Sequence, residues 1–168
     1  ASRNAADFKN LMDVYLDAVF FPNMIKDKQI LMQEGWHYHL DSADDELTYR
    51  GVVYNEMKGV FSSPDSQMER HVMDALFPDT TYGVESGGNP DDIPNLTQEG
   101  FAAFHAKYYH PSNSYIFLYG DMDIDQTLAF IDGEYLSQFQ AQTIDSAIGR
   151  QACPGSQVQT FPYGIATG

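Results

Sequence analysis

Apolar residues recur every three to four positions in several stretches of the chain, a spacing that predicts amphipathic helices. Asn4 is suited to cap the first helix, and Pro22 ends it. Its apolar side comprises Phe8, Leu11, Met12, Tyr15, Leu16, Val19 and Phe20. Ser63 followed by a proline, Thr97 and Asp123 each precede another such pattern, so three further helices are predicted to begin at these caps.

Two segments have the patterns of strands. Trp36–Leu40 alternates large apolar residues with histidines, which is typical of a strand with one buried face. Tyr115–Tyr119 is continuously apolar and is predicted to be a strand covered on both faces. From about Gln140 the composition changes to Gln, Ser, Gly and Pro, which indicates a linker with a further strand near Val158–Ile165. The predicted class is α+β, with helices packed on one sheet.

Glu56 lies in an unusual position within a predicted helix over Tyr49–Gly59. At about 100° per residue, it falls in the middle of an apolar stripe. The stripe also contains Tyr49, Val52, Val53, Met57 and Val60. A carboxylate that faces inward needs a cation, because desolvating it alone costs several kcal/mol or more. The cation is either an Arg or Lys, as for most inward glutamates, or a metal ion such as zinc.

Other chemistry-bearing residues have simpler explanations. His37 and His39 share one strand face and can bind a metal as a pair, but no third ligand follows at close spacing, which favours a half-exposed face without metal. His105 and His110 end a helix, where such groups stabilise the terminus. The Ser-Gly-Gly-Asn sequence at residues 86–89 lacks the context of a phosphate-binding loop and is predicted to be a turn.

Composition excludes several classes of function. The chain has 24 acidic and nine basic residues, a formal charge of −15, which argues against nucleic-acid binding. No apolar run is long enough to span a bilayer, and no signal peptide is visible, so no membrane partner is expected. Cys153 is the only cysteine, which excludes an internal disulfide and mildly favours a reducing compartment such as the cytoplasm.

A collinear series of motifs resembles one protein family. Val-Val-Tyr-Asn-Glu-Met-Lys-Gly at residues 52–59 resembles the third-ligand helix of the presequence-peptidase branch of the insulinase/pitrilysin metallopeptidases. The segments Leu11–Phe21, Gln33–Trp36, Thr81–Pro94 and Phe104–Asn113 are similar to that branch in the same order. The resemblance spans roughly residues 4–140, and an ordered series is more specific than one motif.

The resemblance implies an inverted His-x-x-Glu-His zinc motif, which this chain does not contain and which would lie upstream of it. The two histidines would bind zinc, the glutamate would deprotonate the zinc-bound water, and Glu56 would be the third zinc ligand. Residues 1–139 would be the latter part of a catalytic domain of the two-layer α+β type. Residues 140–168 would be a linker and the start of the next segment.

The chain is therefore expected to be a fragment of a zinc-dependent peptidase that hydrolyses unfolded oligopeptides. Alone it is expected to be inactive and to bind zinc weakly or not at all, because one carboxylate is a poor site. Its expected partners are peptide substrate and the remaining domains of the parent, and its exposed sheet edge allows self-association. The alternatives are a non-catalytic scaffold of the same superfamily and, less favoured, a free-standing peptide-binding module.

Overall fold

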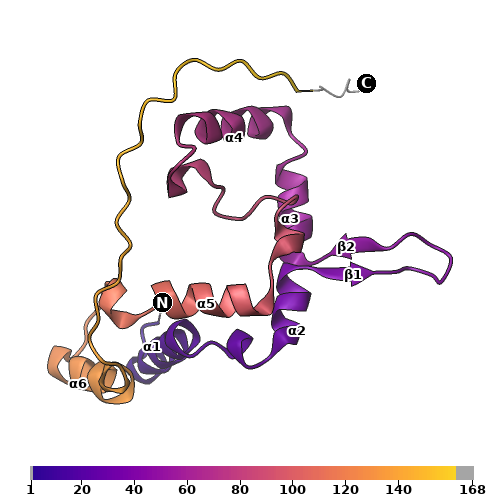
Figure 1. The fold of residues 1–168 in the computed structure, drawn as a ribbon. Helices are drawn as coiled ribbons and strands as arrows, with labels where there is room; N and C mark the ends of the chain where they lie inside the picture. Colours follow the sequence, from indigo (N-terminus) through magenta and orange to yellow (C-terminus); the bar gives the residue numbers. More distant parts are fainter. Residues whose placement is uncertain (1, 162–168) are drawn as a thin grey trace. The chain divides into compact units, whose positions relative to one another are not determined.

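The computed structural model describes residues 2–161, which form helices and one small antiparallel sheet (Figure 1). The helices are α1 (Ala5–Phe20), α2 (Lys28–Ile30), α3 (Val52–Val60), α4 (Pro64–Leu76), α5 (Gln98–Tyr108) and α6 (Ile124–Glu134). The strands are β1 (His37–His39) and β2 (Thr48–Arg50). A π-helical segment follows α2 at Leu31–Gly35, and short 3₁₀ turns lie at Asn23–Ile25, Thr81–Gly83, Ile93–Asn95, Pro111–Asn113 and Leu136–Gln138.

The described chain divides into two compact units. The first combines residues 2–30 with 97–146, and the second combines residues 31–96 with 147–161. Each unit therefore joins segments that are far apart in the sequence. None of the helices in the described part of the chain is long and apolar enough to cross a membrane.

Three of the four predicted helix caps are confirmed as side-chain caps. The Asn4 side chain accepts hydrogen bonds from the backbone N–H groups of Ala6 and Asp7, at 2.9 and 3.2 Å. Thr97 and Asp123 accept one each in the same way at the starts of α5 and α6. These bonds satisfy N–H groups that have no partner within the helix, which is why the caps mark the helix starts so well. The Ser63 side chain makes no such bond, and α4 begins with Pro64 in its first turn.

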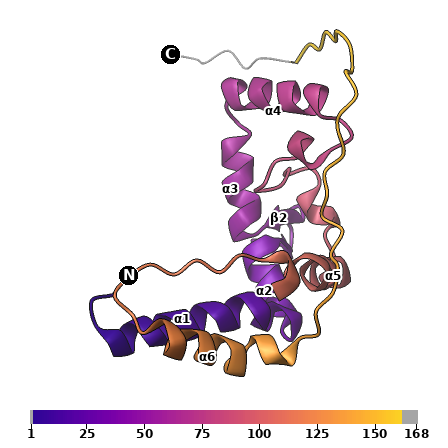
Figure 2. The same ribbon diagram turned by 90° about the vertical axis from the view of Figure 1, so that its left-hand side faces the viewer.

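The first unit has its core between α1 and α6, which lie side by side (Figures 1 and 2). The buried residues of this core are Met12, Leu16, Phe20, Ile131 and Tyr135. Met12, Leu16 and Phe20 recur at every fourth position of α1, as the apolar pattern predicts. Leu11 and Tyr15, which the pattern also placed on the apolar side, are exposed. Helix α5 is joined to α1 by the buried His105, whose ring Nε2–H donates to the Val19 carbonyl oxygen at 2.8 Å.

Tyr135 binds α1 through its hydroxyl group. The hydroxyl lies 2.7 Å from the Asp13 carbonyl oxygen and also within hydrogen-bonding distance of the Asp13 carboxylate. Burial of the side chain, followed by its hydrogen bond to Asp13, raises the pKa of Tyr135 above its ordinary value of about 10. Folding therefore favours the protonated hydroxyl. This stabilisation is fully present below pH 10 and is lost as the pH rises above it.

Tyr135→Phe is expected to lower the free energy of unfolding at pH 8 by about 0.5–1.5 kcal/mol, because the hydroxyl bonds to Asp13 are lost. It should also reduce the loss of stability between pH 9 and 11, because no phenol is left at this position to ionise. Urea unfolding followed by far-UV circular dichroism at each pH measures both effects. Tyr15→Phe, on the exposed side of α1, is the matched control and should change neither quantity. An unaltered alkaline slope in Tyr135→Phe would exclude Tyr135 as its source.

The second unit is built around a hairpin that continues directly into α3. Strands β1 and β2 pair with His37 opposite Arg50, Tyr38 opposite Tyr49, and His39 opposite Thr48. Gly51 then comes so close to the preceding π-helical segment that a Cβ atom on it would lie 2.1 Å from the Gly35 carbonyl oxygen. Only glycine fits such an approach of two backbones.

The strand predicted at Tyr115–Tyr119 is wrong for this structure, because no other described strand pairs with the segment. Tyr115 is fully exposed, Phe117 and Tyr119 nearly so, and Leu118 packs against the core of the first unit. A strand needs a neighbour for its backbone groups, and residues 2–161 do not supply one. A continuous apolar run therefore does not by itself make a strand.

The other strand predictions have mixed outcomes. Trp36–Leu40 is confirmed over His37–His39, whereas β2 was not predicted because its pattern is only three residues long. The helix drawn from Tyr49 begins at Val52, since Tyr49 belongs to β2. Residues 158–161 do not form a strand, and the rest of the predicted strand near Val158–Ile165 lies outside the described residues. The described part is thus mostly helical, with one two-stranded sheet in place of the larger sheet expected for a two-layer fold.

Candidate functional site

Helix α3 holds Glu56, the metal-ligand candidate, at a position defined by its neighbours. The helix begins immediately after β2, and its first turn closes where the Asn55 N–H donates to the Gly51 carbonyl oxygen at 3.0 Å. Met57, the next residue after Glu56, is buried, and its sulfur would lie 2.4 Å from a Cβ placed on Gly87. Close packing on the Met57 side therefore sets the rotation of α3.

Glu56 is exposed, which corrects the expectation that it faces the interior. The apolar residues of its stripe are open as well: Val52 is 54% exposed and Val60 46%. The periodic pattern correctly groups these residues on one face of the helix. Val53 is half-buried and Met57, at the margin of the face, is buried, so the described segments leave most of this face open. Glu56 thus lies within an apolar surface that has no cover in residues 2–161.

Residues 2–161 contain neither an ion pair nor a hydrogen bond that involves the Glu56 side chain. The described ion pairs are those of Asp41 with His39 and Arg50, and of Asp74 with Arg70 and His71. The arginine or lysine partner considered from the sequence is therefore not found here. The same residues also contain no group of three or more His, Cys, Asp or Glu side chains that is able to hold a metal ion. Glu56 by itself does not make a zinc site.

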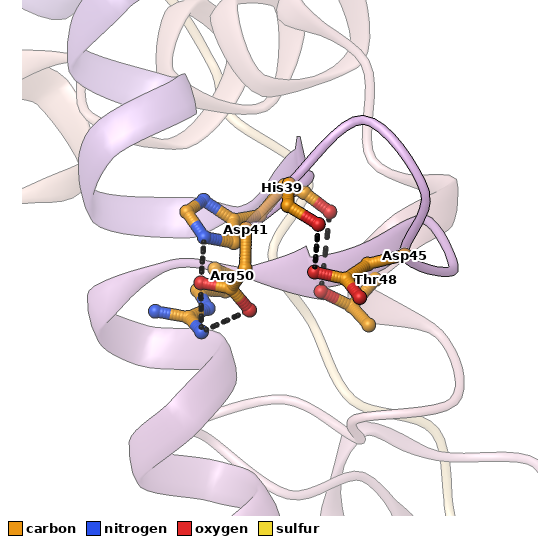
Figure 3. Close-up of polar contacts among 6 residues, drawn as sticks. His39, Asp41, Asp45, Thr48 and Arg50 are labelled. Atoms are coloured by element: carbon orange, nitrogen blue, oxygen red, sulfur yellow. Dashed lines mark hydrogen bonds and ion pairs between the residues drawn. The ribbon is translucent and has the colours of Figure 1, made fainter.

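A cluster of polar side chains lies on one face of the hairpin that leads into α3 (Figure 3). One terminal nitrogen of Arg50 lies 3.1 Å from each carboxylate oxygen of Asp41, and His39 Nε2 lies 2.9 Å from the same carboxylate. The hydrogen bond from His39 and the nearby Arg50 guanidinium lower the pKa of Asp41 against the opposing effect of desolvation. The Thr48 hydroxyl donates to the His39 carbonyl oxygen at 3.2 Å. The cluster ties both strands together just before α3 begins.

The opposite face of the hairpin is aromatic, and the sequence pattern alone did not predict this cluster. The Trp36, Tyr38 and Tyr49 rings contact one another with centroids 5.4–5.7 Å apart, and Tyr49 contacts Tyr54 of α3 at 6.0 Å. The neighbouring Tyr38 raises the pKa of Tyr49. The Trp36 indole N–H donates to the Leu96 carbonyl oxygen at 3.1 Å. The sequence signal for this cluster is the placement of Trp36 and Tyr38 on one face of the predicted strand. The three rings come together only because β2 pairs Tyr49 with Tyr38.

His37, His39 and His110 each have a separate hydrogen-bond partner among the described residues. His37 Nδ1 lies 2.7 Å from the Met32 carbonyl oxygen, to which it donates, and His39 is bound to Asp41. His110 accepts a hydrogen bond from the Ser112 N–H at 3.1 Å, next to the end of α5. The segment at residues 86–89 is a turn, in which Gly88 has a φ of +91°. The turn predicted at residues 86–89 is therefore confirmed.

Comparison with known proteins places the chain in a family. The family described as "Peptidase M16 inactive domain" matches residues 95–166, a range that does not include Glu56. Protein HypA of Clostridium perfringens is 58% identical over 167 residues, which is 99% of this chain and 17% of that protein. Presequence protease 1, chloroplastic/mitochondrial, of Arabidopsis thaliana is 55% identical over 84% of the chain, and the mitochondrial presequence protease of Danio rerio is 44% identical over 90%.

The similarity extends along almost the whole chain but covers only part of each relative. The chain spans 13% of the Arabidopsis protein and 15% of the Danio protein. Identities of 44–58% over 141–167 residues include both units of the structure. The chain is therefore a presequence-protease-like segment of the M16, or insulinase, peptidase family.

Proposed function

We propose that this chain is the part of a zinc-dependent peptidase that carries the third zinc ligand, Glu56. The observation behind the proposal is an unpartnered carboxylate in the middle of an apolar helix face that residues 2–161 leave open. In the longer parent, further segments cover this face. An ionised Glu56 then requires a cation, because burial without one costs several kcal/mol. Glutamate is an accepted zinc ligand in hydrolases.

The rest of the site is proposed to come from outside these residues. The family resemblance implies two histidines and a general base from an upstream His-x-x-Glu-His motif. This chain positions one ligand, the Glu56 carboxylate. Met57 sets the rotation of α3 about its axis, and the hairpin sets where the helix begins. The isolated chain is proposed to be inactive. In the same proposal, residues 1–139 are the latter part of the catalytic domain, and residues 140–168 are a linker and the start of the next segment.

The larger fold is proposed to be the two-layer sheet with packed helices. Tyr115–Tyr119 supports this, because Tyr115, Phe117 and Tyr119 are much more exposed than Ile116 and Leu118, and no strand lies beside the segment among the described residues. In the parent it is proposed to join a sheet with a segment outside this chain. In the isolated chain the same exposed edge allows self-association. Unfolded peptides are the proposed substrates, in keeping with the names of the presequence-protease relatives.

The test of this function is removal and return of metal in the full-length parent. Purified parent is expected to contain one zinc per chain, to lose peptidase activity in a zinc chelator, and to regain it when zinc is added back. The isolated 168-residue chain, assayed beside it on the same unfolded peptides, should show neither bound zinc nor cleavage. A parent that holds no zinc and cleaves nothing would support the alternative, a scaffold subunit of the same family.

The compartment of the parent remains a separate prediction. The single cysteine favours a reducing interior such as the cytoplasm. The plant and animal relatives, in contrast, are named as mitochondrial or chloroplastic proteins. Those names describe the relatives. If the parent comes from an organism with mitochondria or chloroplasts, the competing proposal is that the parent is located in one of these organelles.

A further inference from the structure

Helix α4 has an apolar side that the proposed zinc chemistry does not use. None of its residues is buried, and Met68 and Val72 are 64% and 50% exposed. Both line a cavity of about 540 Å³ along the helix, together with His71 and Ala75. Exposed apolar groups at this spacing form one continuous face, since positions 68, 72 and 75 share a side of a helix.

The far side of this cavity is formed by the chain's own segment Gln157–Phe161. The Phe161 ring stacks on the His71 imidazole with centroids 3.7 Å apart and planes 10° from parallel. Residues 147–161 have no regular secondary structure, and they follow an extended path past α4 (Figure 2). The segment thus occupies the groove as a single extended strand of peptide.

A second contact holds the segment upstream of the groove. The Gln151 side chain accepts a hydrogen bond from the Asp79 N–H at 3.0 Å and donates one to the Asp79 carboxylate at 2.8 Å. Residues 151–161 carry no charged side chain, which matches an apolar groove. A short tether of this kind keeps Phe161 at a high effective concentration near α4, so a weak contact suffices to fill the groove.

We propose that the apolar side of α4 is a peptide-binding site for an extended, uncharged segment that carries an aromatic side chain. The aromatic ring stacks on His71, and the residues before it lie along Met68 and Val72. The chain's own Gln157–Phe161 fills this site in cis, so the site is closed to other peptides while Phe161 is seated. The proposal uses no metal and does not rest on the proposed function of Glu56.

The test is to empty the groove and offer the segment back as a free peptide. Phe161→Ala removes the anchor ring, and Val158→Ala, at an almost fully exposed residue of the same segment, is the matched control. The probe is a synthetic peptide with the sequence of Gly155–Phe161, and its control has Ala in place of Phe161. Binding to the 168-residue chain is followed by the NMR signals of the His71 ring and the Met68 methyl group.

The peptide is expected to bind the Phe161→Ala chain at least about tenfold more tightly than the unaltered chain. If the chain's own segment occupies the site in about 90% of the molecules, only about 10% can bind the added peptide, which weakens the apparent affinity about tenfold. Val158→Ala should behave like the unaltered chain, and the control peptide should not bind. Two results would overturn the proposal: no change at His71 or Met68 when peptide is added to Phe161→Ala, or equal affinity for all three chains.

A second copy of the chain is the competing occupant, and isotope labelling distinguishes it. In a mixture of ¹³C-labelled and unlabelled chains, filtered nuclear Overhauser effects detect only contacts between different molecules. The proposal expects the contact of the Phe161 ring with the Met68 methyl group inside one molecule, and hence no filtered signal. A filtered signal between these groups would assign the groove to self-association and overturn the occupation in cis.

Discussion

Replacing Glu56 with Gln in the full-length parent should remove both zinc and peptidase activity. Glutamine has nearly the shape of glutamate but lacks the negative charge that a metal ligand provides. Loss of an outer hydrogen-bond partner of a ligand already costs about 10–100-fold in metal affinity or activity. Loss of the ligand itself should therefore lower activity by about 100-fold or more. Metal analysis of the purified variant, together with cleavage of an unfolded peptide, measures both losses.

Glu69→Gln is the matched control for this experiment. Glu69 is an exposed glutamate on α4, within the same unit, so the substitution makes the same change of charge away from the candidate site. It should leave zinc content and activity as they were. In the isolated chain Glu56→Gln should leave the stability almost unchanged, because Glu56 is exposed there and has no described partner. Full zinc content in the Glu56→Gln parent would rule out Glu56 as a ligand.

Gly51→Ala should be the most destabilising single methyl addition in the second unit. Its Cβ would lie 2.1 Å from the Gly35 carbonyl oxygen and 2.8 Å from the Trp36 Cα, and neither backbone atom can move by rotating a side chain. Overpacking of this kind costs about 1–3 kcal/mol, and a clash with backbone belongs at the upper end. Trp36 is the only tryptophan of the chain, so its fluorescence in urea reports unfolding at the altered position.

Gly59→Ala is the control, because it adds the same methyl group within α3 where nothing lies within 4 Å. Alanine is a better helix former than glycine, so this variant should be as stable as the unaltered chain or gain up to about 1 kcal/mol. In the full-length parent Gly51→Ala should also lower zinc content, because the start of α3 is displaced. If Gly51→Ala unfolds at the same urea concentration as Gly59→Ala, the close approach of the two backbones is not present in solution.

The helices were predictable from local signals. Asn4, Thr97 and Asp123 cap their helices as expected, since a cap depends on a side chain and N–H groups only two or three residues away. Met12, Leu16 and Phe20 of α1 form the core with α6 for the same reason: a helix presents every third or fourth residue to one side.

The strands and the surroundings of Glu56 were less predictable. Tyr115–Tyr119 has the composition of a buried strand, but pairing depends on a neighbour that residues 2–161 do not include. Burial of Glu56 was inferred from a stripe of apolar residues, and the stripe exists, but its cover is absent from the described residues. Both predictions depended on contacts distant in the sequence, which a local pattern does not contain.

The sequence by itself determined where α1, α4, α5 and α6 begin and which face of a helix is apolar, because both follow from interactions within a few residues. It also carried the ordered motifs through which the family was identified. Only the tertiary structure decided that β2 brings Tyr49 opposite Tyr38, that Gly51 lies against the Gly35 carbonyl oxygen, and that Phe161 stacks on His71. These contacts join residues 11–90 positions apart, and their energy depends on geometry that exists only once the chain has folded.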